Sequence, residues 1–422
     1  MMQLRTAYRA MPALLLAIPL WVFVLWYALI EPRLPADGYA VDAAAKATGT
    51  LAFIGPFCAL TAAWEGSRLR RGQLWKRPTV RSRVHVASLS MLPAVLVGFV
   101  GICAAIETGT TRAGAWAPDL RFVAMSALDI VAYAAAGFAA GIVLPLALAG
   151  PLAAVGVFAW LAFVPAFEPV WLRHLTGMFR DCCALSEDLA WQAVIASAIA
   201  DLGFIAAAAL IASGLAKRGF AATAALAVSL LVGVALVAGM TYAPVVPRDH
   251  GQLACVVHEG TTVCTWPEHA ESADEIAAVI AEARSGWLAA GINPPSEFTE
   301  ASSSITPAGA LGFAVRGGSS RDDIIAALAS AMIPPDPNCP GGATGGVAVV
   351  DLAAWYSAAA GMSSRTLQLQ FGGAGFPGYD RPLSVVAHLL AATPQARQDW
   401  LARARAIAQA CDDWPADQIA VH

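Results

Sequence analysis

Long apolar runs separated by short polar segments fill residues 1–243. A helix needs about 20 apolar residues to cross a hydrocarbon core roughly 30 Å thick, and seven runs approach or exceed that length. The predicted spans are residues 11–30, 47–64, 86–106, 122–141, 152–166, 190–212 and 221–240. This part is therefore predicted to be an all-α polytopic membrane domain with about seven transmembrane helices.

The first run, residues 11–30, could be read as a signal peptide or as a retained span. Its apolar stretch is longer than the about 7–15 residues of a typical signal core, and no small-x-small cleavage site follows at once. We expect a retained span.

From residue 244 the pattern changes to shorter amphipathic segments. Alternation over residues 252–265, with a turn at Glu259-Gly260, predicts a β-hairpin. Helical spacing predicts several helices, and Ser320 is the expected N-cap of one. The helices are expected over 272–290, 320–333, 349–362, 384–391 and 395–411, and a strand over 367–371. Residues 244–422 are predicted to form a mainly helical α+β domain with its own core.

The connection between the second and third spans is basic. Residues 65–84 hold one acid, Glu65, and seven cations: Arg68, Arg70, Arg71, Lys76, Arg77, Arg81 and Arg83. Short basic loops beside spans stay in the cytoplasm. The N-terminus is therefore expected in the cytoplasm and, after seven spans, the C-terminal domain outside it. A short helix is expected from Glu65 to Trp75; the alternative is that these charges only set the topology.

Composition agrees with a membrane protein. The chain of 422 residues is 58% hydrophobic and 13% charged, whereas soluble domains average about 25% charged residues. Residues 244–422 carry nine Arg, no Lys and 18 Asp plus Glu. So acidic a domain is not expected to bind nucleic acid.

The cysteines follow the same division. Cys58 and Cys103 lie in predicted spans, and the other six lie in segments expected outside, where thiols oxidise. Disulfides are expected between Cys255 and Cys264 and between Cys339 and Cys411. A metal site is the rival interpretation, but neither Cys-x-x-Cys nor His-x-x-x-His spacing occurs, so no metal is expected.

The chain shows no catalytic constellation. His258-Glu259 begins like a zinc-peptidase motif, but the second His is missing. A phosphate-binding loop is also missing, so this chain is not expected to hydrolyse ATP, to use a cofactor or to be an enzyme. Glu268 and His269 place an acid beside an imidazole, which a surface turn explains as well as a site does.

Two acids fall within predicted spans. Asp129 lies in the fourth and Asp201 near the middle of the sixth. Such residues are costly and often functional; near the edge of a span they could instead be solvated or bonded to a neighbouring Ser. Gly137 and Gly141 form a Gly-x-x-x-Gly pair that permits close helix packing.

The segment between the fifth and sixth spans is predicted to contain an amphipathic helix at the outer interface. Its apolar residues recur at helical spacing: Trp171, Leu172, Leu175, Met178 and Phe179.

The order of these pieces resembles the permease subunit of an ABC exporter of the ABC-2 type. Residues 64–71 stand where that family has a cytoplasmic coupling helix, and residues 78–83 resemble the segment leading into span three. Residues 136–145 resemble the small-residue span four, and residues 171–179 stand where the family has re-entrant or interfacial outer helices. The resemblance covers residues 1–218, about half of the chain.

The resemblance implies an integral permease subunit in the bacterial plasma membrane, paired as a homodimer or heterodimer and exporting an unknown compound. A separate ABC ATPase would contact Glu65, Arg68, Arg70 and Arg71. The seventh span and the C-terminal domain depart from the pattern, as in some actinobacterial permease-like proteins. Two alternatives follow: a membrane-anchored binding or sensor protein, and a degenerate, inactive peptidase-like domain on a membrane anchor.

Overall fold

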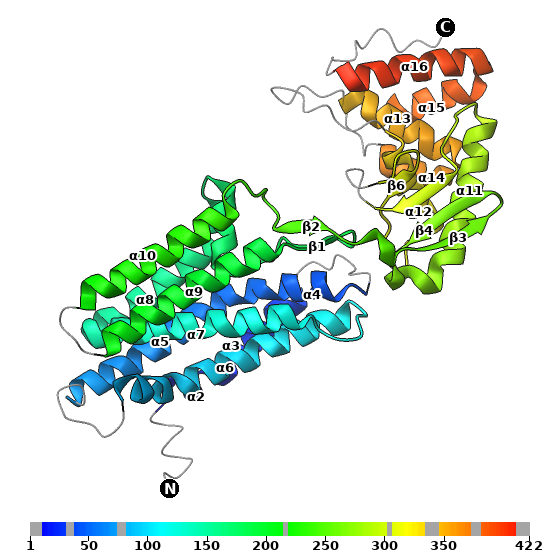
Figure 1. Ribbon diagram of the computed structural model, residues 1–422. Helices are drawn as coiled ribbons and strands as arrows, with labels where there is room; N and C mark the ends of the chain where they lie inside the picture. Colours follow the sequence, from blue (N-terminus) through cyan, green and yellow to red (C-terminus); the bar gives the residue numbers. More distant parts are fainter. Residues whose placement is uncertain are drawn as a thin grey trace. The chain divides into compact units, whose positions relative to one another are not determined.

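The computed structural model describes residues 11–30, 38–73, 82–213, 218–301, 306–333, 346–372 and 381–410 (Figure 1). The chain divides into two compact units, residues 1–248 and 249–422. We call the first the bundle and the second the C-terminal unit. Each is described by itself.

Six helices in the described part of the bundle are long and apolar enough to cross a membrane, which is typical of a multi-pass membrane protein. They are Ala40–Arg71 (α4, Ala40–Ala47; η1, Thr48–Thr50; α5, Leu51–Arg71), α6 (Arg83–Arg112), α7 (Leu120–Val143), α8 (Leu146–Ala162, continued by η3, Val164–Ala166), α9 (Trp191–Ala212) and α10 (Arg218–Val237).

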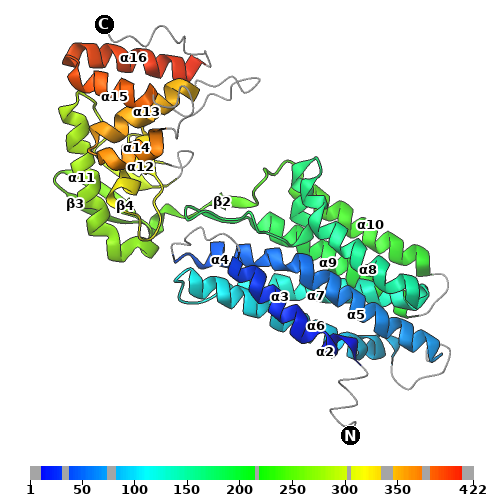
Figure 2. The ribbon, with the colours of Figure 1, turned by 180° about the vertical axis from the view of Figure 1, so that it is seen from behind.

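The first predicted span is not one continuous helix. It is divided at Leu16 into α2 (Pro12–Leu15) and α3 (Ala17–Ile30). Pro19 has no N–H, so the Leu15 carbonyl lacks its usual helical partner and the helix restarts. The 14 residues of α3 extend about 21 Å, so α3 needs α2 as well to approach the roughly 30 Å of a hydrocarbon core; residues 12–30 together extend about 28 Å. Figure 2 shows α2 and α3 beside α6.

Helices α5 and α7 form the centre of the bundle. In each of the corresponding spans 67% of the apolar window is buried, against 22% for the span of α8 and 17% for that of α10. α5 packs against α7 and α8, and α7 also packs against α9 (Figure 1). The central helices therefore provide the interior, while the peripheral ones expose apolar side chains.

The segment between α8 and α9 is not the amphipathic α-helix that was expected. It forms a 3-10 helix, η4 (Val170–Thr176), and Gly177 ends it in the left-handed conformation. Its path is set by contacts with other segments, such as the hydrogen bond from the Tyr133 hydroxyl to the Thr176 carbonyl and the contact of His174 with the Thr241 carbonyl. A short strand, β1 (Glu187–Leu189), then pairs antiparallel with β2 (Val245–Pro247), joining this segment to the chain after α10.

The C-terminal unit contains a four-stranded sheet in the order β3-β4-β5-β6. β3 (Ala254–His258) and β4 (Thr261–Thr265) form the expected hairpin, whereas β5 (Glu297–Glu300) and β6 (Leu311–Phe313) are parallel to β4. The described helices are α11 (Ala273–Ala289), α12 (Arg321–Ala331), α13 (Gly346–Ala359), α14 (Ser364–Phe371), α15 (Arg381–Ala391) and α16 (Pro394–Ala410).

Two local predictions for this unit have different outcomes. Ser320 caps α12 as expected, and with Asp323 it forms a reciprocal capping box. The predicted strand over residues 367–371 is wrong, because these residues belong to α14. Ser363 caps that helix through the Thr366 N–H, so a local cap overrides the alternating pattern.

The core of the C-terminal unit is built on large aromatic side chains. Trp287, Trp355, Tyr356 and Trp400 are fully buried. The indole of Trp287 donates a hydrogen bond of 2.8 Å to the Tyr356 carbonyl, which joins α11 to α13. The buried indole therefore has a polar partner as well as apolar contacts.

The hairpin places Cys255 directly opposite Cys264. Their sulfurs lie 2.01 Å apart, at disulfide distance. The adjacent Cys182 and Cys183, for which no pairing was predicted, also lie at disulfide distance. Cys339 and Cys411, the second predicted pair, lie outside the described residues.

Candidate functional site

The two acids predicted within spans face one another in the structure. Asp129 on α7 and Asp201 on α9 are 0% and 3% exposed. Each carboxyl group lies within hydrogen-bonding reach of the other. Helical packing of α7 against α9 brings them together, although 71 positions separate them in the sequence.

The pair has no cationic partner among the described residues. Neither Asp129 oxygen meets a hydrogen-bond donor there, and no Lys or Arg contributes charge to either acid. The nearby cations have other partners: Arg173 pairs with Asp181, and Arg121 pairs with acids at the helix end. Ser126, one turn before Asp129, also has a buried hydroxyl without a partner.

The segment η4–Gly177 covers the pair. The Tyr133 hydroxyl, one turn after Asp129, donates a hydrogen bond of 2.9 Å to the Thr176 carbonyl. Gly177 has a φ of +71° and lies against the Asp129 carboxyl so closely that any Cβ would overlap both of its oxygens. Glycine is therefore required by the backbone conformation and by the close approach.

Polar contacts hold this cover in place. The His174 ring lies 2.9 Å from the Thr241 carbonyl. Burial lowers the pKa of His174, so the ring is neutral near pH 7 and we assign its Nε2–H as the donor. The Thr48 hydroxyl accepts a hydrogen bond of 3.0 Å from the Phe179 N–H. The segment is thus attached to the chain after α10 and to the start of the α5 span.

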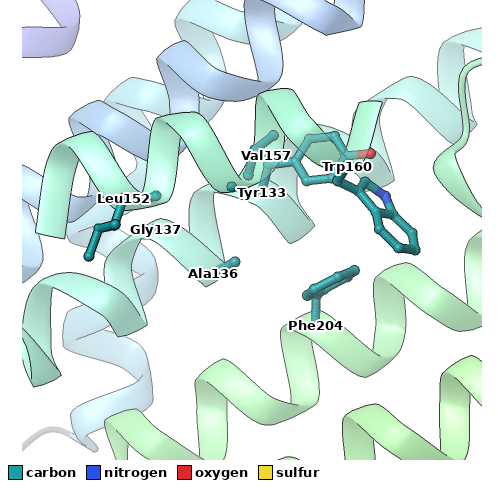
Figure 3. A pocket seen from close by; sticks show the side chains of 9 residues that line it. Tyr133, Ala136, Gly137, Leu152, Val157, Trp160 and Phe204 are labelled. Carbon is teal, nitrogen blue, oxygen red and sulfur yellow. The ribbon is translucent and has the colours of Figure 1, made fainter. Parts of the chain in front are cut away.

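Tyr133 also lines a partly open cavity of about 340 Å³ (Figure 3). Trp160 on α8 and Phe204 on α9 meet edge to face across 5.8 Å at its wall. The Trp160 indole also lies beside the Tyr133 hydroxyl. The remaining lining residues are small or aliphatic: Ala136, Gly137, Leu152, Ala153, Gly156 and Val157. Tyr133 therefore joins the carboxyl pair to an apolar, aromatic cavity.

The residues proposed to contact an ATPase lie on the last two turns of α5 rather than on a separate helix. The helix ends at Arg71, and Trp75 lies outside the described residues. Glu65 is buried and pairs with Arg68 at 3.2 Å. Arg70 donates a hydrogen bond of 2.8 Å to the Val143 carbonyl, at the end of α7. The side chains of Arg68, Arg70 and Arg71 are all exposed.

Gly137 and Gly141 lie where α7 meets α5. A Cβ on Gly137 would overlap the Ala59 carbonyl, and one on Gly141 would overlap the Ala63 carbonyl. The Ser67 hydroxyl donates a hydrogen bond of 3.1 Å to the Gly141 carbonyl. The two helix backbones therefore approach as closely as glycine allows.

In the C-terminal unit, the imidazole of His269 pairs with Glu300 on β5. Nδ1 of His269 lies 2.7 Å from Glu300 Oε1, and the other carboxylate oxygen accepts from the Trp266 N–H at 3.0 Å. Both side chains are buried. The described residues contain no group of three or more His, Cys, Asp or Glu that could hold a metal.

A second buried acid of this unit, Asp351 on α13, lies 3.0 Å from Arg381 on α15. Burial raises the pKa of Asp351 to about 6, although Arg381 opposes the shift. Every buried acid described in this unit thus has a basic neighbour.

The sequence contained a signal for part of the site. Tyr133 follows Asp129 by four residues and Phe204 follows Asp201 by three, so each aromatic shares a helix face with an acid. The contribution of Gly177 and Thr176 had no such signal, because it depends on the path of η4 across the bundle.

A family model described as a domain of unknown function (DUF7224) matches residues 263–411, within the C-terminal unit. No curated protein and no solved structure matches the chain.

Proposed function

We propose that this protein is the membrane-spanning permease subunit of an ATP-driven exporter of the ABC-2 type, acting with a separate ATPase subunit. It would lie in a bacterial plasma membrane as a homodimer or heterodimer, with its N-terminus in the cytoplasm and its C-terminal unit outside. The exported compound would be recognised within the bundle.

The observation that carries the proposal is the position of η4. This non-α-helical segment lies between the helices that correspond to spans five and six, where the resembled family has re-entrant or interfacial helices. It is buried from His174 to Thr176 and contacts the central helix α7 through the Tyr133–Thr176 hydrogen bond. Irregular backbone within a membrane protein is stable where protein covers it or where it borders a cavity.

The end of α5 supports a coupling role and refines it. Glu65 is buried, and Arg70 is bonded to the end of α7. Arg68 pairs with Glu65 along the same helix. Arg68 and Arg71, whose side chains are exposed, are better placed to contact a soluble partner. Since α5 is continuous with the centre of the bundle, movement at Arg71 would be transmitted along the helix to the α5–α7 contact.

Copurification tests the proposal. The full-length protein is extracted from its native host in detergent, and bound proteins are assayed for ATP hydrolysis and identified by mass spectrometry. We expect an ABC ATPase with the wild type and its loss in the double variant Arg68→Glu/Arg71→Glu. An exposed ion pair contributes about 0–1 kcal/mol, so both charges are reversed. Failure of the wild type to retain an ATPase would contradict the proposal.

The matched control is Arg70→Gln, which removes a cation from the same turn but one with a contact inside the bundle. It should keep the ATPase. Thiol labelling of Cys255 after reduction, in intact cells, shows whether each variant has kept its topology. We expect the topology to survive, because Lys76, Arg77, Arg81 and Arg83 remain as cytoplasmic charges.

The rival function is a membrane-anchored binding or sensor protein. One observation favours it: the family match lies entirely in the C-terminal unit, which has its own aromatic core. The same experiment separates the two, since a sensor without transport would copurify with no ATPase.

A further inference from the structure

We propose that Asp129 and Asp201 form a proton-binding site, in which one proton is held between the two carboxyl groups inside the bundle. The inference does not depend on the proposed ATPase partner. It concerns how a membrane interior can hold two acids without a cation.

Burial and distance carry the argument. Asp129 is 0% exposed and Asp201 3%, and their carboxyl groups lie within hydrogen-bonding reach. Two carboxylates in direct contact cannot both be ionised in a weakly polar environment, because each charge loses hydration and repels the other. With one proton, the same contact becomes a charge-assisted hydrogen bond between O–H and O⁻.

The surroundings supply no alternative cation among the described residues. From η4, His174 is neutral and bonded to Thr241, and Arg173 is held by Asp181. From α7, the neighbours are the hydroxyls of Ser126 and Tyr133, and from α8 the indole of Trp160. The Asp129 oxygens have no donor from any of these groups. A proton bound between the two carboxyl groups is therefore the positive charge that removes their mutual repulsion.

The fold also limits exchange of this proton with water. Gly177 lies on the Asp129 carboxyl, and the ring of Tyr133, which lines the cavity, lies near both acids. Loss or uptake of the proton then requires movement of η4 or of the α7–α9 contact. Proton exchange would accordingly accompany a conformational change of the bundle.

Infrared spectroscopy of the full-length protein in detergent tests the proposal directly. At about pH 8 exposed carboxylates are ionised, and so is Asp351, whose pKa is about 6. We expect the C=O stretch of a protonated carboxyl in the wild type, shifted when aspartate carries ¹³C. Asp129→Asn and Asp201→Asn should each abolish the band, because the remaining carboxylate then accepts from an amide N–H₂ and needs no proton.

Asp119→Asn, at the start of α7, is the matched control and should leave the band unchanged, because Asp188 still holds Arg121. Absence of an aspartate-derived band in the wild type would overturn the proposal, and so would a band that survives in both Asn variants. The isotope-labelled wild type decides the question even if a variant does not fold. Retention of an ATPase is measured separately, so this proposal and the proposed function can fail independently.

Discussion

The bundle and the C-terminal unit are packed differently. Where α5 meets α7 in the bundle the contacts are between small residues, such as Gly137 against Ala59, while Leu89, Leu92 and Leu96 of α6 are exposed. Both units bury aromatic rings, but the fully buried tryptophans among the described residues all lie in the C-terminal unit. Lipid provides little hydrophobic driving force between helices, so close backbone packing must hold them together; in water, burial of large apolar surfaces does so.

The two units also differ in how they bury charge. In the C-terminal unit, Glu300 lies against His269 and Asp351 against Arg381. In the bundle, Glu65 likewise pairs with Arg68, but Asp129 lies against another acid. Removing one partner of a buried ion pair leaves an uncompensated charge inside the protein, so the basic neighbour of each acid accounts for its burial. A pair of acids has no such explanation, which is why we assign function to the bundle pair and structure to the other two.

The largest effect should come from the aromatic core. Trp287→Ala removes a fully buried side chain and its hydrogen bond to Tyr356. We expect a loss of about 3–5 kcal/mol in the unfolding free energy of the C-terminal unit, measured by thermal unfolding of the full chain. The neighbouring Leu288→Ala is the control, because that side chain is 45% exposed. Equal losses would contradict the division into core and surface.

A smaller change should destabilise the bundle nearly as much. Gly137→Ala adds a single methyl group that overlaps the Ala59 carbonyl, so α5 and α7 must separate. We expect a loss of about 3 kcal/mol, at the upper end for overpacking, seen as a lower thermal midpoint in detergent. Gly156→Ala on α8 is the control: its Cβ meets open space, so the change should be neutral or slightly stabilising. A tolerated Gly137→Ala would disprove close packing as the basis of the bundle.

The paired acid Asp351 sharpens the comparison through pH. Its pKa is about 6 when folded and about 3.9 when unfolded. Between these values the folded state binds more protons, so stability falls as pH rises. Integrating the difference from about pH 5 to about pH 7.5 gives a loss of about 1–1.5 kcal/mol for the C-terminal unit. Asp351→Asn should remove this contribution in calorimetric scans; an unchanged pH dependence would exclude Asp351 as its source.

The periodicity of apolar residues predicted many elements of each unit, because these elements are determined by residues close together in the sequence. The hairpin follows from alternation around Glu259-Gly260, and the cap of α12 from Ser320. The break at Leu16 was not predicted, because the hydropathy of residues 11–30 contains no information about the missing N–H of Pro19. Residues 65–71 are helical as expected, but as the end of α5 and not as a separate helix. Gly66 and Ser67 continue α5 through contacts with α7, and these depend on tertiary packing.

The candidate site also depends on tertiary packing that the sequence does not reveal. The sequence identified Asp129 and Asp201 singly, as costly residues within spans. Their mutual contact could not be predicted, because it depends on which faces of α7 and α9 meet. The partner of His269 was also out of reach: Glu300 comes from the parallel strand β5, whose register no local pattern specifies.

The smallest predicted effects concern helix ends, where the two units again differ. α12 is capped locally by Ser320 and Asp323. The Val143 carbonyl at the end of α7 instead accepts a hydrogen bond from Arg70, which belongs to another helix, α5. Ser320→Ala should cost the C-terminal unit about 1 kcal/mol. Arg70→Ala should cost the bundle about 0.5–1 kcal/mol, since its hydrogen bond is exposed to solvent.

Thermal midpoints of the two units measure both cap losses, and Arg71→Ala is the control for Arg70 because it removes the same charge from the same turn. A lower bundle midpoint with Arg70→Ala, but not with Arg71→Ala, would assign Arg70 to the α5–α7 contact. Equal midpoints would mean that the Arg70–Val143 bond adds no stability. Arg70 would then join Arg68 and Arg71 as a residue available to the soluble partner, and the region proposed to receive the ATPase would widen by one residue.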